Sequence, residues 1–255
     1  MATVLITGAS GGIGKDLAEI FARKKYNLIL VARSKDVLDK MAAGFEQQYA
    51  VRANYFDIDL SQPNSAENLY EQVKESGVTI DILVNNAGVG LSGETVEMDL
   101  KKVTNMLTLN MNSLTELSLL FGHDMKQNRS GKILNIASTA AFQPAPYLGA
   151  YAATKAYVLS FSEALYIELK KYGVSVTAAC PGPTITGFAN GADMENTKLF
   201  KAGAMSSKVV AQKAYEALMS NKMTSVIGLR NKLLATSVRF FPRKWIAAIS
   251  GKMMK

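Results

Sequence analysis

Short, unbroken runs of apolar residues alternate along the chain with longer segments whose apolar residues recur at helical spacing. Unbroken apolar runs are typical of strands in a parallel sheet, because helices cover both of its faces. Strand–helix–strand alternation at this spacing predicts a doubly wound α/β fold. The expected strands are residues 3–6, 28–31, 51–56, 82–84, 132–137 and 174–179, and the expected helices are residues 13–24, 34–48, 65–76, 100–126 and 151–171.

The domain organisation follows from the same pattern. The chain has no internal repeat, low-complexity stretch or linker, and 255 residues with 48% hydrophobic content can bury one large core. We therefore expect a single domain over residues 1–228. Residues 229–255 are expected to form an extra amphipathic helical segment, because apolar residues recur there at helical spacing and Pro242 can start a second helix.

The net charge of +8 is concentrated near the C-terminus. Residues 1–216 hold 21 basic and 21 acidic side chains, whereas residues 217–255 hold eight basic side chains and no acidic one. A neutral body without a recognised nucleic-acid-binding module argues against nucleic acid as a partner. Two interpretations stay open for residues 229–255: an interfacial segment lying on anionic lipid, or a helical pair packed on the body or on a sister subunit.

Location and metal content are constrained only loosely. No stretch reaches the roughly 20 apolar residues of a membrane-spanning helix, and the first 30 residues lack the basic region of a secretory signal. The single cysteine, Cys180, cannot form an internal disulfide, which fits a reducing compartment. One cysteine and one histidine cannot supply the usual zinc ligands. We expect a cytoplasmic protein without a metal, associated with a membrane only if the basic segment binds lipid.

A glycine-rich turn joins the first expected strand to the first expected helix. Glycine lets a backbone turn sharply and approach a pyrophosphate, which the free N–H groups and the dipole of the following helix then bind. Because this glycine pattern stands between a strand and a helix, it predicts dinucleotide binding rather than an ordinary loop. The residues expected to line the cradle are Gly8, Ser10, Gly12, Ile13 and Gly14.

The glycine spacing, TGxxxGxG, resembles the short-chain dehydrogenase/reductase family, and the resemblance runs over residues 3–187 and more loosely to Gly228. It implies a Rossmann fold, a nicotinamide cofactor, hydride transfer at a carbonyl or alcohol carbon, and assembly into a homo-oligomer, a dimer or tetramer. Further motifs follow the glycine turn in the family's order: Asn85-Asn86-Ala87-Gly88, Asn110, Ser138, Tyr151-x-x-x-Lys155 and Pro181-Gly182.

The end of the second strand indicates which cofactor binds. A carboxylate there would bind the ribose hydroxyls of NAD and repel a 2′-phosphate. This chain has Arg33 and Ser34 instead, and a guanidinium can hold a phosphate through paired hydrogen bonds. We therefore expect NADP(H), although many NADP-preferring relatives also carry a basic residue where this chain has Gly11.

Tyr151 and Lys155 are four residues apart on one helix and share a face. A tyrosine is a poor base at neutral pH, but a neighbouring ammonium stabilises its phenolate and lowers its pKa. We expect Tyr151 to act as the general acid or base and Ser138 to orient the substrate oxygen. The resemblance adds that Lys155 binds the nicotinamide ribose and that Asn110 anchors a water in a proton relay.

The resemblance also assigns cofactor contacts that are individually weak. Asp59 could equally cap the helix that follows it. A mobile flap over the substrate is implied for residues 187–206, and its apolar residues favour a lipophilic substrate. The implied contacts are Asp59 and Leu60 with adenine, Asn86, Ala87 and Gly88 beside the adenine ribose, and Pro181, Gly182, Thr184 and Thr186 near the nicotinamide, while Phe188, Met194, Leu199, Phe200 and Met205 would form the apolar wall.

The sequence thus predicts an NADP(H)-dependent oxidoreductase acting on a lipophilic small molecule: a 3-oxoacyl compound, a steroid-like compound or a simple ketone. The alternative is a catalytically silent protein of the same fold that senses NADP(H). Such proteins tend to lose the tyrosine or the lysine, and this chain keeps both. The substrate, the direction of reaction and the oligomeric state stay open.

Overall fold

A parallel sheet forms the centre of the molecule, as expected. The computed structural model describes residues 1–187, 197 and 203–254. Its main sheet has seven strands in the order β3-β2-β1-β4-β5-β6-β9, and all neighbours pair in parallel. The doubly wound α/β prediction is therefore confirmed. The strands are β1 (Thr3–Thr7), β2 (Asn27–Ala32), β3 (Ala53–Asp57), β4 (Ile82–Asn85), β5 (Gly131–Ile136), β6 (Val174–Cys180) and β9 (Thr224–Val226).

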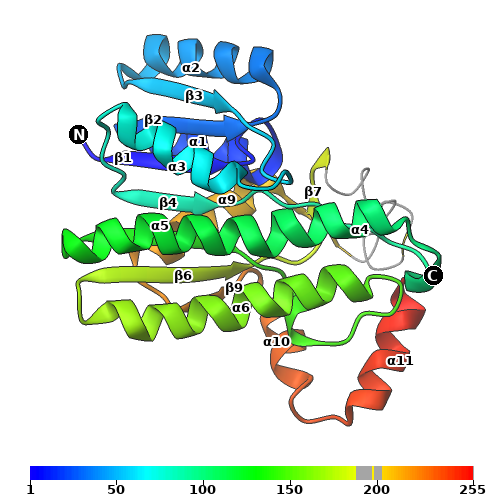
Figure 1. Cartoon of the computed structure of the whole chain (residues 1–255). Helices are drawn as coiled ribbons and strands as arrows, with labels where there is room; N and C mark the ends of the chain where they lie inside the picture. The colour runs from blue at the N-terminus through cyan, green and yellow to red at the C-terminus, as the bar shows by residue number, and fades with distance from the viewer. Residues whose placement is uncertain (188–196, 198–202, 255) are drawn as a thin grey trace.

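Helices cover both faces of the sheet (Figure 1). One apolar cluster joins β1 and β2 to α1, α2 and α9, and a second joins the opposite face to α3, α5 and α6. The strands β1 to β6 have unbroken apolar runs because each of them contributes side chains to both clusters. The helices are α1 (Gly12–Arg23), α2 (Lys35–Tyr49), α3 (Ser65–Glu75), α4 (Leu100–Leu107), α5 (Leu114–Gln127), α6 (Gly149–Lys170) and α9 (Ser207–Met219).

The helix expected over residues 100–126 is interrupted. A π-helical turn, η2 (Thr108–Ser113), separates α4 from α5. The side chain of Asn110 explains it: this residue is 1% exposed and hydrogen-bonds to the backbone of Val89. A continuous α-helix was the wrong prediction because the cause of the interruption lies 21 residues away in the sequence.

Several elements after residue 180 were not predicted. They include α9, the last sheet strand β9, and a small pair of parallel strands, β7 (Thr184–Ile185) and β8 (Met205–Ser206). The two helices expected at the end of the chain are present as α10 (Leu229–Ser237) and α11 (Arg243–Met253), and Figure 1 shows them projecting from one end of the α/β body. Among the described residues, no helix combines the length and apolar character needed to cross a bilayer.

Candidate active site

The glycine turn is tightly built at the carboxyl end of β1. Gly8 and Gly12 have φ angles of +64° and +52°, a region that favours glycine. At Gly14 an added Cβ would lie 2.3 Å from the carbonyl oxygen of Gly8, so only glycine fits there. Thr186 contacts the same turn, because a Cβ on Gly12 would lie 3.0 Å from its methyl carbon. The turn is thus compact, with the N-terminus of α1 directly behind it.

Asn86 ties this turn to the end of β4. Its amide nitrogen donates hydrogen bonds to the carbonyl oxygens of Thr7, at 2.9 Å, and Gly8, at 3.1 Å. The Thr7 hydroxyl in turn accepts hydrogen bonds from the backbone N–H groups of Asn86 and Ala87. The Asn86 side chain therefore holds the scaffold of the turn, and the expected contact of residues 86–88 with an adenine ribose stays a prediction.

The end of β2 presents a charged side chain to solvent. Arg33 and Ser34 are both exposed. Burial raises the pKa of the Asp59 carboxyl group, but hydrogen bonds from Ser61 and the nearby guanidinium of Arg33 lower it, and the net shift is downward. Asp59 accepts hydrogen bonds from the backbone and hydroxyl of Ser61, so it caps a turn that precedes α3 rather than the helix itself. Leu60 is buried in the core, and its carbonyl oxygen accepts a hydrogen bond from Ser113.

Tyr151 and Lys155 lie one turn apart near the start of α6, as predicted. Both are buried, with exposed fractions of 8% and 5%. The ammonium nitrogen of Lys155 lies 5.8 Å from the centre of the Tyr151 ring and donates a 2.8 Å hydrogen bond to the carbonyl oxygen of Ile136, at the end of β5. The end of the strand therefore fixes the position of the lysine.

The protonation of this pair differs from the expectation. Burial raises the pKa of Tyr151 to about 12, and a hydrogen bond with the Ser138 side chain partly offsets the rise. Burial also lowers the pKa of Lys155 to about 8, against an opposing effect of Cys180. Desolvation of the phenol is therefore the dominant effect on the pKa of Tyr151. Tyr151 is thus held as a neutral proton donor.

Ser138 stands where β5 gives way to the short 3-10 helix η3 (Thr139–Phe142). Its hydroxyl oxygen accepts a 3.1 Å hydrogen bond from the backbone of Ala140 and so caps that helix. The same side chain is hydrogen-bonded to Tyr151. The end of β5 and the start of α6, which follow one another in the chain, therefore bring the two hydroxyl groups together.

Asn110 reaches this group from the π-helical turn. Besides its bonds to Val89, its amide nitrogen donates a 3.1 Å hydrogen bond to the hydroxyl of Thr154, which donates in turn to the carbonyl oxygen of Tyr151. Its oxygen lies beside Gly88, 3.2 Å from where a Cβ would stand. Thr154 was not predicted as a site residue, although its position between Tyr151 and Lys155 could have indicated it.

The loop after β6 closes the other side of the site. Thr184 donates a 2.9 Å hydrogen bond to the carbonyl oxygen of Gly182. Gly182 packs against Asn231 of α10 so closely that a Cβ would lie 2.4 Å from the Asn231 amide nitrogen. Nothing in the sequence motifs pointed to Asn231, because its contact with Gly182 depends on the tertiary placement of α10.

The apolar wall expected from residues 187–206 is only partly visible. Phe188, Met194, Leu199 and Phe200 lie outside the described residues, and Met205 stands in β8 beside Thr184. A different apolar cluster adjoins the site. Buried Met106, Ala145, Leu148 and Ala152 pack together with Tyr151, and the partly buried residues against them are Val89, Leu91, Ala140, Ala150 and Met254.

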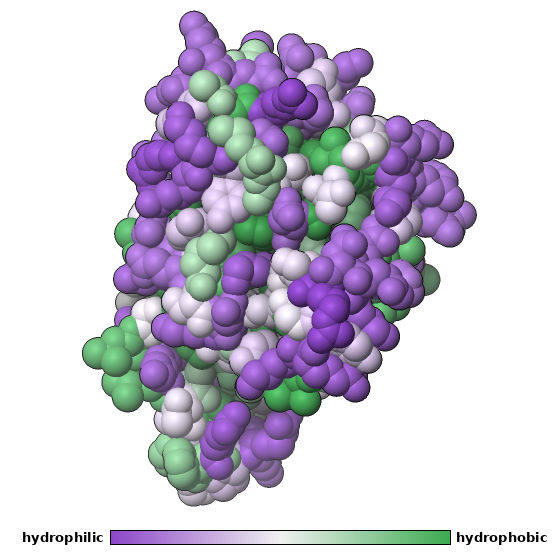
Figure 2. All heavy atoms as spheres, turned by 90° about the vertical axis from the view of Figure 1, so that its left-hand side faces the viewer, coloured by the Kyte–Doolittle hydropathy of each residue, from purple (hydrophilic) through white to green (hydrophobic). Residues whose placement is uncertain are grey.

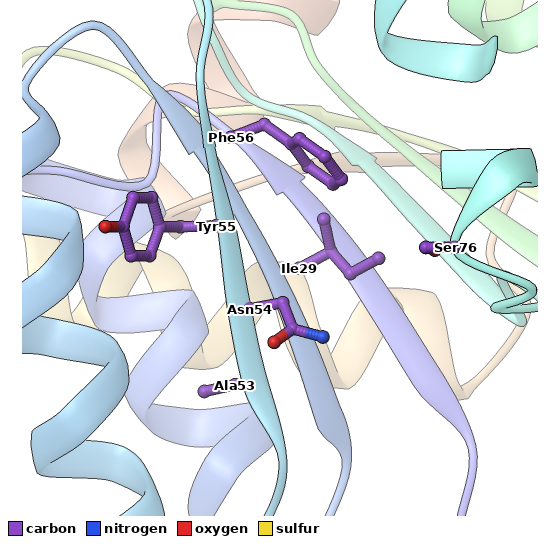
Figure 3. Close-up of a pocket in the computed structure, with 6 residues that line it drawn as sticks. All are labelled: Ile29, Ala53, Asn54, Tyr55, Phe56 and Ser76. Carbon is purple, nitrogen blue, oxygen red and sulfur yellow. The ribbon is translucent and has the colours of Figure 1, made fainter. Parts of the chain in front are cut away.

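A cavity of about 300 Å³ lies elsewhere, at the edge strand β3. Figure 3 shows Ile29 and Phe56 on one side of the sheet, while Tyr55 points to the other, where it hydrogen-bonds to Asp39 of α2. None of the expected site residues line this cavity, so it has no part in the argument for catalysis. Its lining residues are Ile29, Ala53, Asn54, Tyr55, Phe56 and Ser76.

A dinucleotide fits the residues that are present. The Gly8–Gly14 turn leaves room for the backbone to approach a pyrophosphate, because added side-chain atoms at Gly12 or Gly14 would fill or distort it. The turn, the end of β2 and the Tyr151 group lie at the carboxyl ends of β1, β2 and β5, the edge where α/β proteins of this class bind ligands. The geometry suits binding and proton transfer at one site.

The comparisons with known proteins agree with this arrangement. The family model for short chain dehydrogenase matches residues 2–196. The chain is 32% identical over 183 residues to a very-long-chain 3-oxoacyl-CoA reductase of Bos taurus, a match covering 69% of this chain and 57% of that protein. It is 30% identical over 232 residues to the ketoacyl reductase HetN of Nostoc sp., covering 91% and 79%. The chain thus spans just over half the length of the first of these relatives.

A solved structure matches over almost the whole chain. A short-chain dehydrogenase from Sphingobium yanoikuyae, in complex with NADPH, superposes with a TM-score of 0.85 and 32% sequence identity, covering 94% of both chains. The family model alone spans well over half of the sequence. Together with the glycine turn and the Ser138–Tyr151–Lys155 group, these matches establish that the chain belongs to the short-chain dehydrogenase/reductase family.

Proposed function

We propose that this protein is an NADP(H)-dependent oxidoreductase that interconverts a carbonyl group and a secondary alcohol. One observation carries the proposal: the buried phenol of Tyr151 is hydrogen-bonded to the half-buried Ser138, with the Lys155 ammonium beside the phenol ring. A buried acid of this kind at the ligand-binding edge of the sheet is suited to proton transfer. Membership of an oxidoreductase family supports the reaction class.

Each residue has a distinct part. In reduction, Tyr151 donates its proton to the oxygen of the substrate as negative charge develops there, and Ser138 hydrogen-bonds the same oxygen. Lys155 stabilises the phenolate left behind. Asn110 anchors the water of the proton relay and holds Val89 and Thr154 in place. The nicotinamide, when bound, would supply or accept the hydride and add a positive charge near the phenolate in its oxidised form.

NADP(H) is the proposed cofactor. The exposed guanidinium of Arg33 at the end of β2 is available to a 2′-phosphate, and no carboxylate stands at this position. The Sphingobium relative binds NADPH, which supports the same choice. The cradle residues proposed to hold the pyrophosphate are Gly8, Ser10, Gly12, Ile13 and Gly14.

The substrate is proposed to be lipophilic. The cluster around Tyr151 is apolar and contains both Val89 and Leu91. The names of two relatives, a 3-oxoacyl-CoA reductase and a ketoacyl reductase, point to the same chemistry. We also propose residues 1–228 as the cofactor-binding and catalytic unit with a flap near residues 187–206, and residues 229–255 as an extension that packs onto it.

Assembly into a homo-oligomer is proposed through the layer of α5 and α6, and the location is proposed to be cytoplasmic. Leu119 of α5 and Ile167 of α6 are 56% and 65% exposed, and Figure 1 shows both helices in the outer layer on the same face of the sheet. Light scattering of the protein and of an Ile167→Glu variant tests this assembly. If the proposal holds, the variant forms a smaller particle.

The decisive test is Tyr151→Phe, which keeps the packing and removes the hydroxyl. We expect the rate of NADPH oxidation with 3-oxoacyl thioesters, ketosteroids and aromatic ketones to fall by about 1,000-fold or more. Tyr157→Phe is the matched control, because it removes a hydroxyl of an exposed residue that is hydrogen-bonded to Thr115. Near-normal turnover in Tyr151→Phe overturns the proposal.

The cofactor is tested in the same assay. Arg33→Asp should reverse the preference for NADPH over NADH, because a carboxylate repels the 2′-phosphate. An unchanged preference overturns the assignment to NADP(H). Tight NADPH binding without turnover of any substrate in the panel would instead identify a silent sensor of the same fold.

A further inference from the structure

The two C-terminal helices carry an unusual amount of exposed apolar surface. Seven of the seventeen exposed large hydrophobic residues in the described part of the chain lie between residues 229 and 249. Isolated apolar residues on a surface need no explanation, but a concentration of them in one short segment indicates an interaction site. The seven are Leu229, Leu233, Leu234, Phe240, Phe241, Trp245 and Ile249, with exposed fractions between 55% and 79%.

The arrangement of these residues places them on the outside of the pair. In α11 Trp245 and Ile249 are one turn apart and share an exposed face, whereas Ile246 is buried. Phe240 and Phe241 stand in the connection between the helices, at the end of the molecule farthest from β2 and β3 in Figure 1. Figure 2 shows hydrophobic and hydrophilic side chains mixed at this lower end.

Basic side chains surround this surface. Lys232, Arg239, Arg243, Lys244 and Lys252 are all exposed. Among the described residues the ion pairs are Lys74–Asp124 and Lys213–Glu216, so these five cations make none within that part of the chain. Residues 217–255 contain no acidic residue. The surface therefore combines aromatic and leucine side chains with positive charge that no ion pair of the described residues neutralises.

We propose that the α10–α11 helix pair binds the surface of an anionic lipid bilayer. Aromatic and leucine side chains beside lysine and arginine are the composition of segments that lie in the lipid interface, where anionic headgroups attract the cations. A symmetric contact between two copies of this surface would bring like charges together, which disfavours a second copy as the occupant. The pair lies on the bilayer, because neither helix could cross it.

Half-buried residues at the C-terminal end of α11 adjoin the apolar cluster of the candidate active site. Gly251 of α11 packs closely against Pro146, because a Cβ added at Gly251 would lie 3.3 Å from the proline ring. Met254, at the end of α11, packs against the apolar cluster that contains Tyr151. The inference that a lipophilic substrate reaches Tyr151 from the bilayer rests on the proposed function, whereas lipid binding itself does not.

The chain contains a built-in probe, because Trp245 is its single tryptophan and is 62% exposed. The full-length protein is mixed with vesicles of phosphatidylcholine alone or of phosphatidylcholine with phosphatidylglycerol. With the anionic vesicles we expect co-sedimentation, a blue shift of the tryptophan emission and protection from acrylamide quenching. High salt should weaken all three. Absence of these changes with anionic vesicles overturns the proposal.

Two pairs of substitutions locate the binding surface. Phe240→Ser/Phe241→Ser and Arg243→Glu/Lys244→Glu should each weaken vesicle partitioning by about tenfold or more. The matched controls are Val37→Ser/Val209→Ser and Lys170→Glu/Lys171→Glu, which change exposed residues of α2, α9 and the end of α6 and should leave partitioning unchanged. Equal losses in the variants and their controls overturn the proposal.

Two further outcomes separate this proposal from others. Shielding of Trp245 that grows with protein concentration in the absence of vesicles, together with a larger particle in light scattering, assigns the surface to a second copy and overturns lipid binding. Reduction of a water-soluble ketone with NADPH is measured in parallel on the same variants. Normal activity there with no vesicle binding refutes the lipid surface alone, whereas vesicle binding without activity in any assay refutes the oxidoreductase.

Discussion

The carboxyl edge of the sheet buries polar side chains, whereas the C-terminal helix pair exposes apolar ones. At the edge, Asn110, Thr154 and Lys155 are at most 5% exposed, and each is hydrogen-bonded. In the helix pair, Phe240 and Trp245 are 79% and 62% exposed. A buried polar group without a partner is costly, so the first region is completed within the chain. The exposed apolar side chains of the helix pair are available to a partner outside the chain.

This difference teaches which substitutions each region should tolerate. Removing a polar side chain at the edge strands a partner in a dry environment, so the loss is larger than that of one hydrogen bond. Removing an apolar side chain from the exposed face of the helix pair strands nothing in the isolated protein. Stability should therefore be sensitive in the first region and insensitive in the second.

The largest effect is expected at Asn110. Asn110→Ala leaves the backbone N–H and carbonyl of Val89 without their partner, and we expect the free energy of unfolding to fall by about 2–4 kcal/mol. Asn112→Ala, an exposed residue of the same π-helical turn, is the control and should change it by less than about 0.5 kcal/mol. Urea denaturation of both variants measures this. Similar values for the two would break the comparison.

A smaller effect is expected at Gly14. In Gly14→Ala the new Cβ would meet the Gly8 carbonyl oxygen and the Asn86 amide, a misfit that costs about 1–3 kcal/mol. Because the misfit distorts the cradle itself, NADPH should bind about 10- to 100-fold more weakly. Gly11→Ala is the control, since nothing lies within 4 Å of its Cβ. Calorimetric titration with NADPH should show near-normal affinity in the control, and equal weakening would refute the cradle.

The smallest effect sharpens the comparison within one helix. Ile246→Val removes a buried methylene of α11 and should cost about 1 kcal/mol, whereas Ile249→Val removes one from the exposed face and should cost almost nothing. Denaturation midpoints of the two variants measure this. If Ile249→Val costs as much as Ile246→Val, the outer face is packed in solution and the contrast between the regions is lost.

The sequence predicted the sheet well because its strands are read locally. Each expected strand coincides with β1 to β6 to within about two residues at either end, since an unbroken apolar run is enough to identify a strand covered on both sides. The strand β9 escaped because Thr224–Val226 is three residues long and only half-buried. The π-helical turn escaped because its cause, the bond from Asn110 to Val89, is tertiary.

The sequence predicted which residues form the candidate site better than it predicted their pKa values and hydrogen-bond partners. Ser138, Tyr151 and Lys155 meet as expected, yet the pKa of Tyr151 is raised by burial, which no spacing of residues reveals. Asn86 was expected beside the adenine ribose, and its side chain holds the glycine turn together. Asn231 was not expected at all, because only the path of the chain after β9 brings it against Gly182.

The π-helical turn also explains how α4 and α5, on either side of it, pack into two different apolar clusters. In an uninterrupted α-helix, Met106 and Leu117 would be eleven residues apart and would share a face, to within about 20°. Yet Met106 packs with the cluster around Tyr151, and Leu117 packs with the core of the sheet. The wider turn between them delays the rotation of the chain by about 100°. It acts as a phase shift, so a deletion of one residue there would aim one half of the helix at the wrong neighbours.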